Sequence, residues 1–202
     1  MDKARYFIAV MMVVALPPAV CAWYIIHPFT TLWRRLGTVA SFCIIYSILI
    51  SAGLLLWEFS PTLLGRDLGF EALLLVPAIP ALVVGATIAR RRRKHLTQRI
   101  LVGTPEISKT DKGRLLTEGI YARTRNPRYL ELLAFVSAYA AFANYTGTWM
   151  LYALVFPAIH LVVLLEEREL RERFGAEYED YCRRVPRYIP KRGDPASPAR
   201  RG

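Results

Sequence analysis

Positive charge is scarce in the first 89 residues of this 202-residue chain, which hold only five of its 27 lysines and arginines. The other 22 lie between Arg90 and Arg201, although apolar residues make up 54% of the chain. An apolar, charge-poor half followed by a basic half excludes an ordinary soluble domain, a disulfide scaffold and a disordered chain. The distribution indicates a membrane protein with one basic face.

Cysteine is also scarce, since the chain holds three, with no CxxC pair and no Cys/His cluster at zinc spacing. We therefore expect free thiols and no structural metal. The motifs GxGxxG, Walker A, GxSxG and HExxH of soluble enzymes are missing too. No nucleic-acid motif accompanies the positive charge, and the basic residues flank apolar runs. The charge therefore fits the cytoplasmic face of a membrane better than a nucleic-acid partner.

Four charge-poor regions are long enough to cross a bilayer core of roughly 30 Å as helices that rise about 1.5 Å per residue. The first three are residues 6–26, 38–57 and 68–89. The fourth, 129–165, is too long for one crossing and carries the turn signal Asn144-Tyr145-Thr146-Gly147 near its centre. We read it as a helical hairpin with arms 129–143 and 148–165. The predicted fold is an all-α polytopic membrane protein with about five transmembrane helices.

The distribution of lysine and arginine predicts the orientation of these helices. With the N-terminus outside, 24 basic residues fall in the cytoplasmic segments 27–37, 90–128 and 166–202, and three fall outside. Positive residues accumulate on the cytoplasmic side of membrane proteins. The N-terminus is therefore expected outside the membrane and both strongly basic segments inside.

The basic segments have distinct expected roles. The run from Arg90 to Lys94 is typical of an anchor that pairs with anionic lipid headgroups. Residues 166–184 have a helical composition, with Glu and Arg at i,i+4 spacing, and Gly175 interrupts them. We divide the chain into three N-terminal helices (1–89), a catalytic region of basic loop, hairpin and cytoplasmic C-terminal helix (90–190), and a disordered tail (191–202). Two of the three histidines, His27 and His95, lie at span ends and are expected to be solvated.

Polar residues collect at the two cytoplasmic ends of the hairpin. Arg125, Asn126 and Tyr129 lie at the start of its first arm, and Glu166 and Glu167 follow its second arm. Because a hairpin returns both ends to the same depth, these residues are expected to face each other. Such a pocket offers a cation to a carboxylate, anions to an ammonium, and a tyrosine ring to a cationic centre. From spacing alone, an interfacial charge network that only closes the hairpin is an equally good interpretation.

Three blocks in this region resemble a known family. In order they are Gly119-x-Tyr121-x-x-x-Arg125-Asn126-Pro127-x-Tyr129-Leu130, Glu166-Glu167-x-x-Leu170-x-x-x-Phe174-Gly175-x-x-Tyr178-x-x-Tyr181 and Val185-Pro186-Arg187-x-Ile189-Pro190. The pattern resembles the isoprenylcysteine carboxyl methyltransferases, integral membrane enzymes that use S-adenosylmethionine. The resemblance covers roughly residues 105–190. The family usually has His-Pro where this chain has Asn126-Pro127, and bacterial-type members often carry Asn there.

The resemblance implies an S-adenosylmethionine-dependent methyltransferase that acts on a lipophilic or small acceptor such as a carboxylate, a thiol or a lipid. It implies that the cofactor is bound by Gly113, Arg114, Leu115, Leu116, Tyr121, Asn126, Pro127, Arg128, Tyr129 and Glu166. Arg125, Glu166 and Glu167 are the expected catalytic residues. A sulfonium is an activated methyl donor, so proximity and alignment could supply most of the acceleration.

One position departs from the resembling family. Eukaryotic members place a substrate-binding arginine one helical turn before the glutamate that matches Glu166, and here that residue is Val162. Burying an unpaired carboxylate is costly, so the change predicts poor methylation of prenylcysteine carboxylates. The acceptor would instead be less charged, or be neutralised by another residue such as Arg123 or Arg128.

Two other functions remain open. Membrane sterol and steroid reductases, which bind NADPH, end in a similar Arg-His-Pro-x-Tyr block and a tail resembling residues 181–186. A non-catalytic adaptor that binds anionic lipid would explain the run from Arg90 to Lys94, but not the paired polar blocks of the hairpin. Membrane lipids and a methyl acceptor are the expected partners.

The charge bias yields a prediction about orientation. In a cysteine-free background, single cysteines at positions 3 and 195 should behave differently towards a membrane-impermeant thiol reagent in intact cells. Only the cysteine at position 3 should be labelled, because it lies on the side with few basic residues. Both should be labelled once the membrane is permeabilised, and labelling of both in intact cells would refute the orientation.

Overall fold

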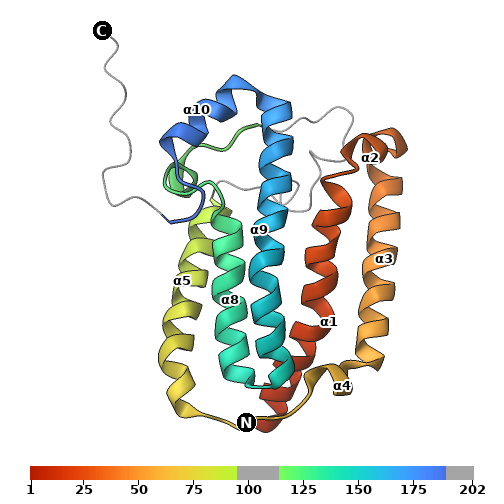
Figure 1. The fold of residues 1–202 in the computed structure, drawn as a ribbon, viewed down its shortest axis with the longest axis vertical. Coiled ribbons are helices and arrows are strands. Elements are labelled where there is room, and N and C mark those ends of the chain that lie inside the picture. The colour runs from red at the N-terminus through yellow and green to blue at the C-terminus, as the bar shows by residue number, and fades with distance from the viewer. Residues whose placement is uncertain (95–113, 190–202) are drawn as a thin grey trace.

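Five long helices lie side by side in the computed structural model, which describes residues 1–94 and 114–189 (Figure 1). They are α1 (Asp2–Ile26), α3 (Thr38–Glu58), α5 (Leu75–Arg93), α8 (Pro127–Ala143) and α9 (Thr146–Phe174). Four helices are long and apolar enough to cross a membrane: α1, α3, Ala72–Arg93 and α9. The fifth, α8, has 17 residues and is short for a crossing. The fold is therefore an all-α polytopic membrane fold, as the sequence predicts.

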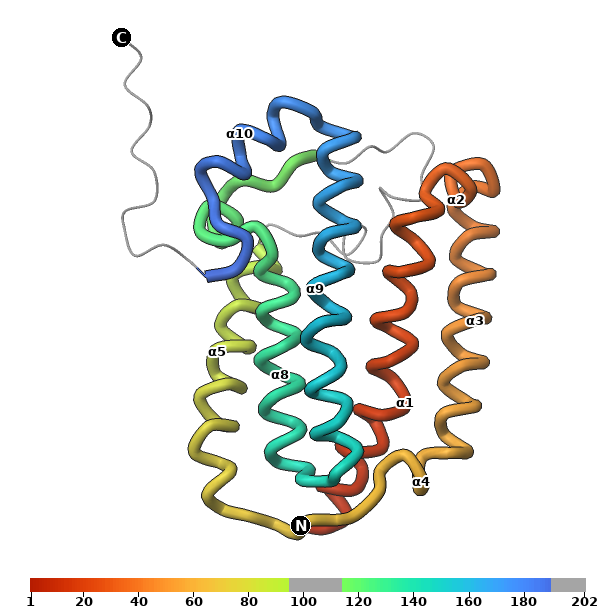
Figure 2. Tube along the Cα trace, viewed as in Figure 1, coloured from red at the N-terminus to blue at the C-terminus, as the bar shows by residue number. Residues whose placement is uncertain are grey.

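Short helices connect or cap the long ones. They are α2 (Thr30–Leu36), α4 (Ser60–Leu64), the 3₁₀ turns η1 (Ala72–Leu74) and η2 (Gly119–Ala122), and α10 (Ala176–Arg184). In Figure 2, α2 and α10 lie at one end of the bundle, whereas α4 and the N-terminus lie at the other. The expected disordered tail, 191–202, lies outside the described residues.

Two helix boundaries differ from the sequence prediction. Residues 65–71 are not helical, so the third span begins at η1 rather than at residue 68. The last span does not stop at residue 165, because α9 continues to Phe174 through the charged segment. Gly175, with a φ of 54°, ends it, and α10 then begins in a new direction. Half of the predicted C-terminal helix is thus a rigid extension of the fifth span.

The turn between α8 and α9 is built by the residues that predicted it. Asn144 takes the left-handed conformation, with a φ of 53°, and caps α8 through its backbone N–H to the Ala140 carbonyl. Gly147 lies so close to α4 that an added Cβ would stand 2.0 Å from the Leu63 carbonyl oxygen. Only glycine fits such an approach. The predicted hairpin is therefore confirmed.

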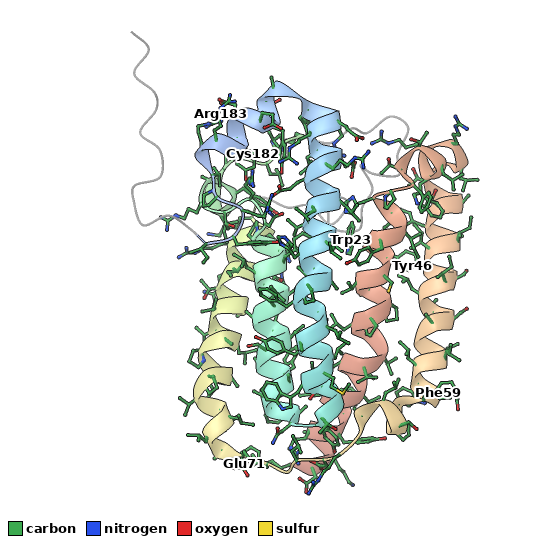
Figure 3. All side chains as sticks on the ribbon, in the orientation of Figure 1. Trp23, Tyr46, Phe59, Glu71, Cys182 and Arg183 are labelled. Atoms are coloured by element: carbon green, nitrogen blue, oxygen red, sulfur yellow. The ribbon has the colours of Figure 1, made fainter. Side chains whose placement is uncertain are left out.

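Helix α1 is the central element of the bundle, since it packs against α3, α8 and α9, whereas α5 packs mainly along α8. An apolar cluster of Val20, Tyr129, Val155, Ile159, Val162 and Val163 joins α1, α8 and α9. Figure 3 shows Trp23 on α1 towards the end of the bundle that carries Cys182, while Glu71 lies at the opposite end. The packing fixes the N-terminus of α8 against the middle of α9.

A buried arginine closes the end of the bundle away from α10. Arg5 is 1% exposed. Its guanidinium donates to Asp67 and, over 3.0 Å, to the Ala143 carbonyl oxygen. It also lies 5.6 Å from the centre of the Tyr145 ring. The pKa of Asp67 is lowered by a hydrogen bond from the Gly69 backbone N–H and by the Arg5 pair. Arg5 thus ties α1 to both the hairpin turn and the 65–71 segment.

Replacing Arg5 should therefore destabilise the fold. We expect Arg5→Met to lower the free energy of unfolding by about 1–3 kcal/mol, because it leaves the buried Ala143 carbonyl without its donor. The readout is the thermal unfolding midpoint in detergent. Arg66→Met is the control, since it removes the same charge from an exposed side chain of the same region. Equal midpoints for the two variants would contradict the role of Arg5.

Candidate active site

The candidate site lies at the α10 end of the bundle, where two chain segments run together. The segment that enters α8 is held by the residues that follow α10: the Arg125 N–H donates to the Pro186 carbonyl over 3.0 Å. The Arg187 carbonyl accepts from the Thr124 hydroxyl and the Asn126 amide, both over 3.2 Å. Pro127 then occupies the first turn of α8, where its missing N–H costs nothing.

Glu167 is the buried centre of this region, with 1% of its surface exposed. Its carboxylate accepts from both Arg187 Nε and Nη2 over 3.0 and 2.9 Å, and from the Asn126 amide over 3.3 Å. Arg125 Nη2 lies 3.1 Å away and Arg171 Nη2 3.6 Å away. Arg125 and Asn126 thus face Glu167, as the hairpin predicts. Protein donors surround both oxygens, so Glu167 serves as an anchor and lines none of the cavities described below.

Glu166 points in another direction and meets Tyr129. The Tyr129 hydroxyl donates to Glu166 Oε2 over 2.5 Å, and the tyrosine is 2% exposed. Nearby, burial raises the pKa of Tyr121 to about 12, and the Glu166 carboxylate adds to the rise while Arg92 and Arg128 oppose it. Tyr121 therefore keeps its proton at neutral pH and remains a neutral donor among these charges.

A first cavity, which we call the polar cavity, lies beside Glu166 and has a volume of about 90 Å³. Its walls come from the segment before η2, from α9 and from α10. The lining residues are Arg114, Leu115, Leu116, Tyr121, Arg125, Asn126, Glu166, Leu170, Arg173, Tyr178 and Tyr181. Six of the residues named as cofactor-binding, together with Arg125, therefore line one cavity. Gly113 lies outside the described residues.

A second cavity, the membrane cavity, lies on the other side of Tyr129 and has a volume of about 250 Å³. It is enclosed by α1, α5, α8 and α9. Its lining residues are Leu16, Ala19, Val20, Trp23, Arg92, Arg128, Tyr129, Glu131, Leu132, Phe135 and Ile159. Arg128 and Tyr129, which the resemblance assigns to the cofactor, line this cavity rather than the polar one. The Tyr129–Glu166 hydrogen bond therefore joins a residue of each cavity.

Contrary to the sequence prediction, Val162 does not lie beside the cofactor and acceptor sites. Val162 is 0% exposed and packs against Tyr129, Val20 and their neighbours. It lines neither cavity. An arginine at this position would lie in the apolar core between helices. Valine in place of the family arginine therefore does not change the lining of either cavity.

Two other expectations are corrected by contacts within the described residues. His27 is 6% exposed rather than solvated, because its Nδ1 lies 2.9 Å from Glu169 Oε2 and its ring stacks on Trp23. Arg92, in the run expected to meet lipid headgroups, turns inward and contacts Glu131 through two hydrogen bonds of 2.6 and 3.0 Å. The other arginines of that run are exposed.

Some lining residues were not among those predicted for the site, although Tyr178 and Tyr181 belong to the blocks that carry the family resemblance. Tyr178 and Tyr181 come from α10, and their shared helix face with Leu170 is the signal that could have placed them. Burial raises the pKa of both tyrosines, and Tyr181 donates to the Tyr121 carbonyl over 2.7 Å. Trp23 comes from α1, and its position in an apolar span gave no signal of a site.

The residues of the polar cavity suit a nucleoside-containing sulfonium ligand such as S-adenosylmethionine. Among the described residues, the buried Nε atoms of Arg125 and Arg173 have no hydrogen-bond partner, so they can donate to a ligand carboxylate. Glu166 can pair with an ammonium, and the tyrosine rings suit a purine or a sulfonium. A volume of about 90 Å³ is below the range of complete ligand pockets.

The anchoring role of Glu167 can be tested. We expect Glu167→Gln to lower the free energy of unfolding by about 3–5 kcal/mol, because it leaves the buried Arg125 guanidinium without its counter-charge. The thermal unfolding midpoint in detergent reports the change. Glu172→Gln, on an exposed part of the same helix, should leave the midpoint unchanged. A Glu167→Gln variant as stable as this control would mean that the arginines find other partners.

Comparison with known proteins places this arrangement in a family. One relative, methanethiol S-methyltransferase 2 from Bradyrhizobium diazoefficiens (strain JCM 10833 / BCRC 13528 / IAM 13628 / NBRC 14792 / USDA 110), is 41% identical over 73 residues, which cover 36% of this chain and 27% of that protein. The chain thus matches about a quarter of the relative's length. No solved structure matches the chain. The model of the phospholipid methyltransferase family matches residues 74–177, slightly more than half of the chain, and includes all of α8 and α9 and both hairpin ends. The chain belongs to the phospholipid methyltransferase family.

Proposed function

We propose that this protein is a membrane methyltransferase that binds S-adenosylmethionine in the polar cavity and receives its methyl acceptor in the membrane cavity. The observation that carries the proposal is the Tyr129–Glu166 hydrogen bond of 2.5 Å, which joins the walls of the two cavities. A transfer enzyme needs donor and acceptor close together but bound by different surfaces. Family membership and the two-cavity arrangement support the same activity.

The polar cavity's residues have distinct proposed roles. Glu166 pairs with the positive part of the donor, and Arg125 and Arg173 bind its carboxylate. Tyr121, Tyr178 and Tyr181 provide aromatic walls on the side of α10 and η2. The bound cofactor supplies a methyl group on a sulfonium, which is already activated for transfer. The protein therefore contributes mainly position and a dry environment.

Glu167, Asn126 and Arg187 act on the site indirectly in this proposal. Their hydrogen bonds hold the start of α8 against α9, and so fix Tyr129 relative to Glu166. A small displacement of either residue would change the distance between donor and acceptor. Such positioning contributes strongly to the rate when little covalent catalysis is needed.

The acceptor is proposed to be a thiol, a carboxylate or a lipid that approaches from the membrane. The membrane cavity is mostly apolar and lies among four helices. The relative's name indicates a thiol acceptor for that protein, and the family's name indicates lipid acceptors. The basic residues at the end of α5 lie at the site's end of the bundle, which supports a cytoplasmic location for the site and an outside N-terminus.

The cofactor role of Glu166 yields a binding prediction. Glu166→Gln should weaken binding of S-adenosylhomocysteine by about 1.5–3 kcal/mol, the scale of a charge-assisted hydrogen bond, measured by calorimetry in detergent. Helical content should not change. Glu172→Gln, an exposed change on the same helix, is the matched control and should bind like wild type.

The same experiment tests the activity class. NADPH should not bind wild type, because the proposal assigns the cavity to a sulfonium cofactor. Wild-type binding of NADPH without S-adenosylhomocysteine would favour a reductase, and binding of neither would favour a non-catalytic protein. Unchanged S-adenosylhomocysteine affinity in Glu166→Gln would remove this residue from the site.

A further inference from the structure

The membrane cavity continues into a long apolar groove between α1 and α8. The groove has a volume of about 520 Å³. It shares Leu16, Ala19, Leu132 and Phe135 with the membrane cavity. The rest of its lining is Phe7, Ile8, Met11, Met12, Ala15, Val136 and Tyr139. The two spaces therefore form one continuous surface that runs along α1 from Phe7 to Trp23.

The length of this surface suits a chain rather than a small molecule. Sixteen residues separate Phe7 from Trp23, which corresponds to about 24 Å along a helix. Half of a bilayer core measures about 15 Å. The groove thus extends beyond one leaflet and is apolar for its whole length, whereas a small thiol would fill only a fraction of the membrane cavity.

Among the residues that the structure describes, the only strongly polar part of this surface is its end beside Tyr129. Two arginines and one glutamate lie there. Arg92 and Glu131 neutralise each other through hydrogen bonds of 2.6 and 3.0 Å across α5 and α8. Their pairing leaves Arg128 as the source of the cavity's net positive charge.

Arg128 is held in place by aromatic rings. Its guanidinium carbon lies 3.8 Å from the centre of the Trp23 ring and 5.6 Å from that of Tyr129. No carboxylate within residues 1–94 and 114–189 forms an ion pair with it. Stacking on an aromatic face leaves the edge of a guanidinium free to donate two hydrogen bonds to an anion. The position is one residue before Tyr129, at the boundary with the polar cavity.

We propose that Arg128 binds an anionic head of the methyl acceptor and that the α1–α8 groove holds the acceptor's single apolar chain. The inference rests on the proposed function and narrows its acceptor to an amphiphile with a carboxylate or a thiolate. Arg128 thereby supplies positive charge to the acceptor from α8, whereas position 162 on α9 lies in the apolar core and lines neither cavity. Arg123, the other candidate, is exposed and lines neither cavity.

The positive charge at the Tyr129 end of the membrane cavity also disfavours acceptors with a cationic or neutral head group. An ammonium would meet Arg128 without a free carboxylate, because Glu131 is already paired with Arg92. A thiol would lose its proton more readily beside the guanidinium, since a nearby cation lowers a thiol pKa. Arg128 is therefore a specificity-determining residue that prefers the nucleophile in its anionic form.

Direct binding of radiolabelled sixteen-carbon probes tests the proposal. The full chain is placed in nanodiscs of zwitterionic lipid, and binding of hexadecanoate, hexadecanethiol, hexadecanol and hexadecylamine is compared. Wild type should bind hexadecanoate or the thiolate at least tenfold more tightly than the amine or the alcohol. Butanoate should not compete, because it has the same head but no chain for the groove.

Two variants separate the head from the chain. Arg128→Gln should lose at least tenfold in affinity for the anionic probe, whereas the exposed Arg123→Gln should not change it. Ala19→Phe should block the passage between cavity and groove and so weaken every sixteen-carbon probe. Ala86→Phe, the same change at an exposed position of α5, is its control.

The outcomes distinguish this inference from the proposed function. Both Arg128→Gln and Ala19→Phe should still bind S-adenosylhomocysteine like wild type, which also shows that they are folded. Equal affinity for all four probes would mean that the groove binds the chain without recognising the head group. Tighter binding of the amine would mean that the site prefers a cationic head group. Either result overturns the inference. If the wild-type protein does not bind S-adenosylhomocysteine, the proposed function itself is refuted.

Discussion

The geometry of the site depends on one buried carboxylate. Glu167 lies where three chain segments meet: the start of α8, the C-terminal third of α9 and the residues after α10. A buried charge of this kind is tolerated only when donors surround it, and here the donors come from all three segments. Removing any one segment would leave charges unpaired in a region with little water. The three segments therefore hold one another in register.

Two residues close to Glu167, namely Glu166 and Tyr129, line different cavities. Glu166 precedes Glu167 on α9 and lines the polar cavity, whereas Tyr129 follows Asn126 by one turn on α8 and lines the membrane cavity. The hydrogen bond between them thus spans the boundary of two very different environments. The polar cavity is rich in arginine and tyrosine, whereas the membrane cavity is mostly apolar and has its charged residues at the end beside Tyr129. In the proposed function, this boundary brings a charged donor and a lipophilic acceptor together while each keeps its own surroundings.

The local sequence carried enough information for the hairpin, and the family resemblance named six of the residues that line the polar cavity. Asn144 to Gly147 predict the turn, and the turn's position makes Arg125 and Asn126 meet the glutamates. The functional roles of these residues stay predictions. What the sequence could not show depends on packing between distant helices. Trp23 joins the membrane cavity because α1 is the central helix, and Arg92 turns inward because α5 lies along α8 beside Glu131.

The short α8 has a consequence for the membrane itself. Its 17 residues extend about 26 Å, less than a hydrocarbon core of roughly 30 Å, and it is tied at both ends by the hairpin turn and by Asn126. Since α8 cannot lengthen, the surrounding lipid is expected to adapt by thinning next to it. Thinning beside α8 would bring headgroups and water closer to the helix end that carries Tyr129. In that case the short helix would shape the surface of the bilayer next to the candidate site.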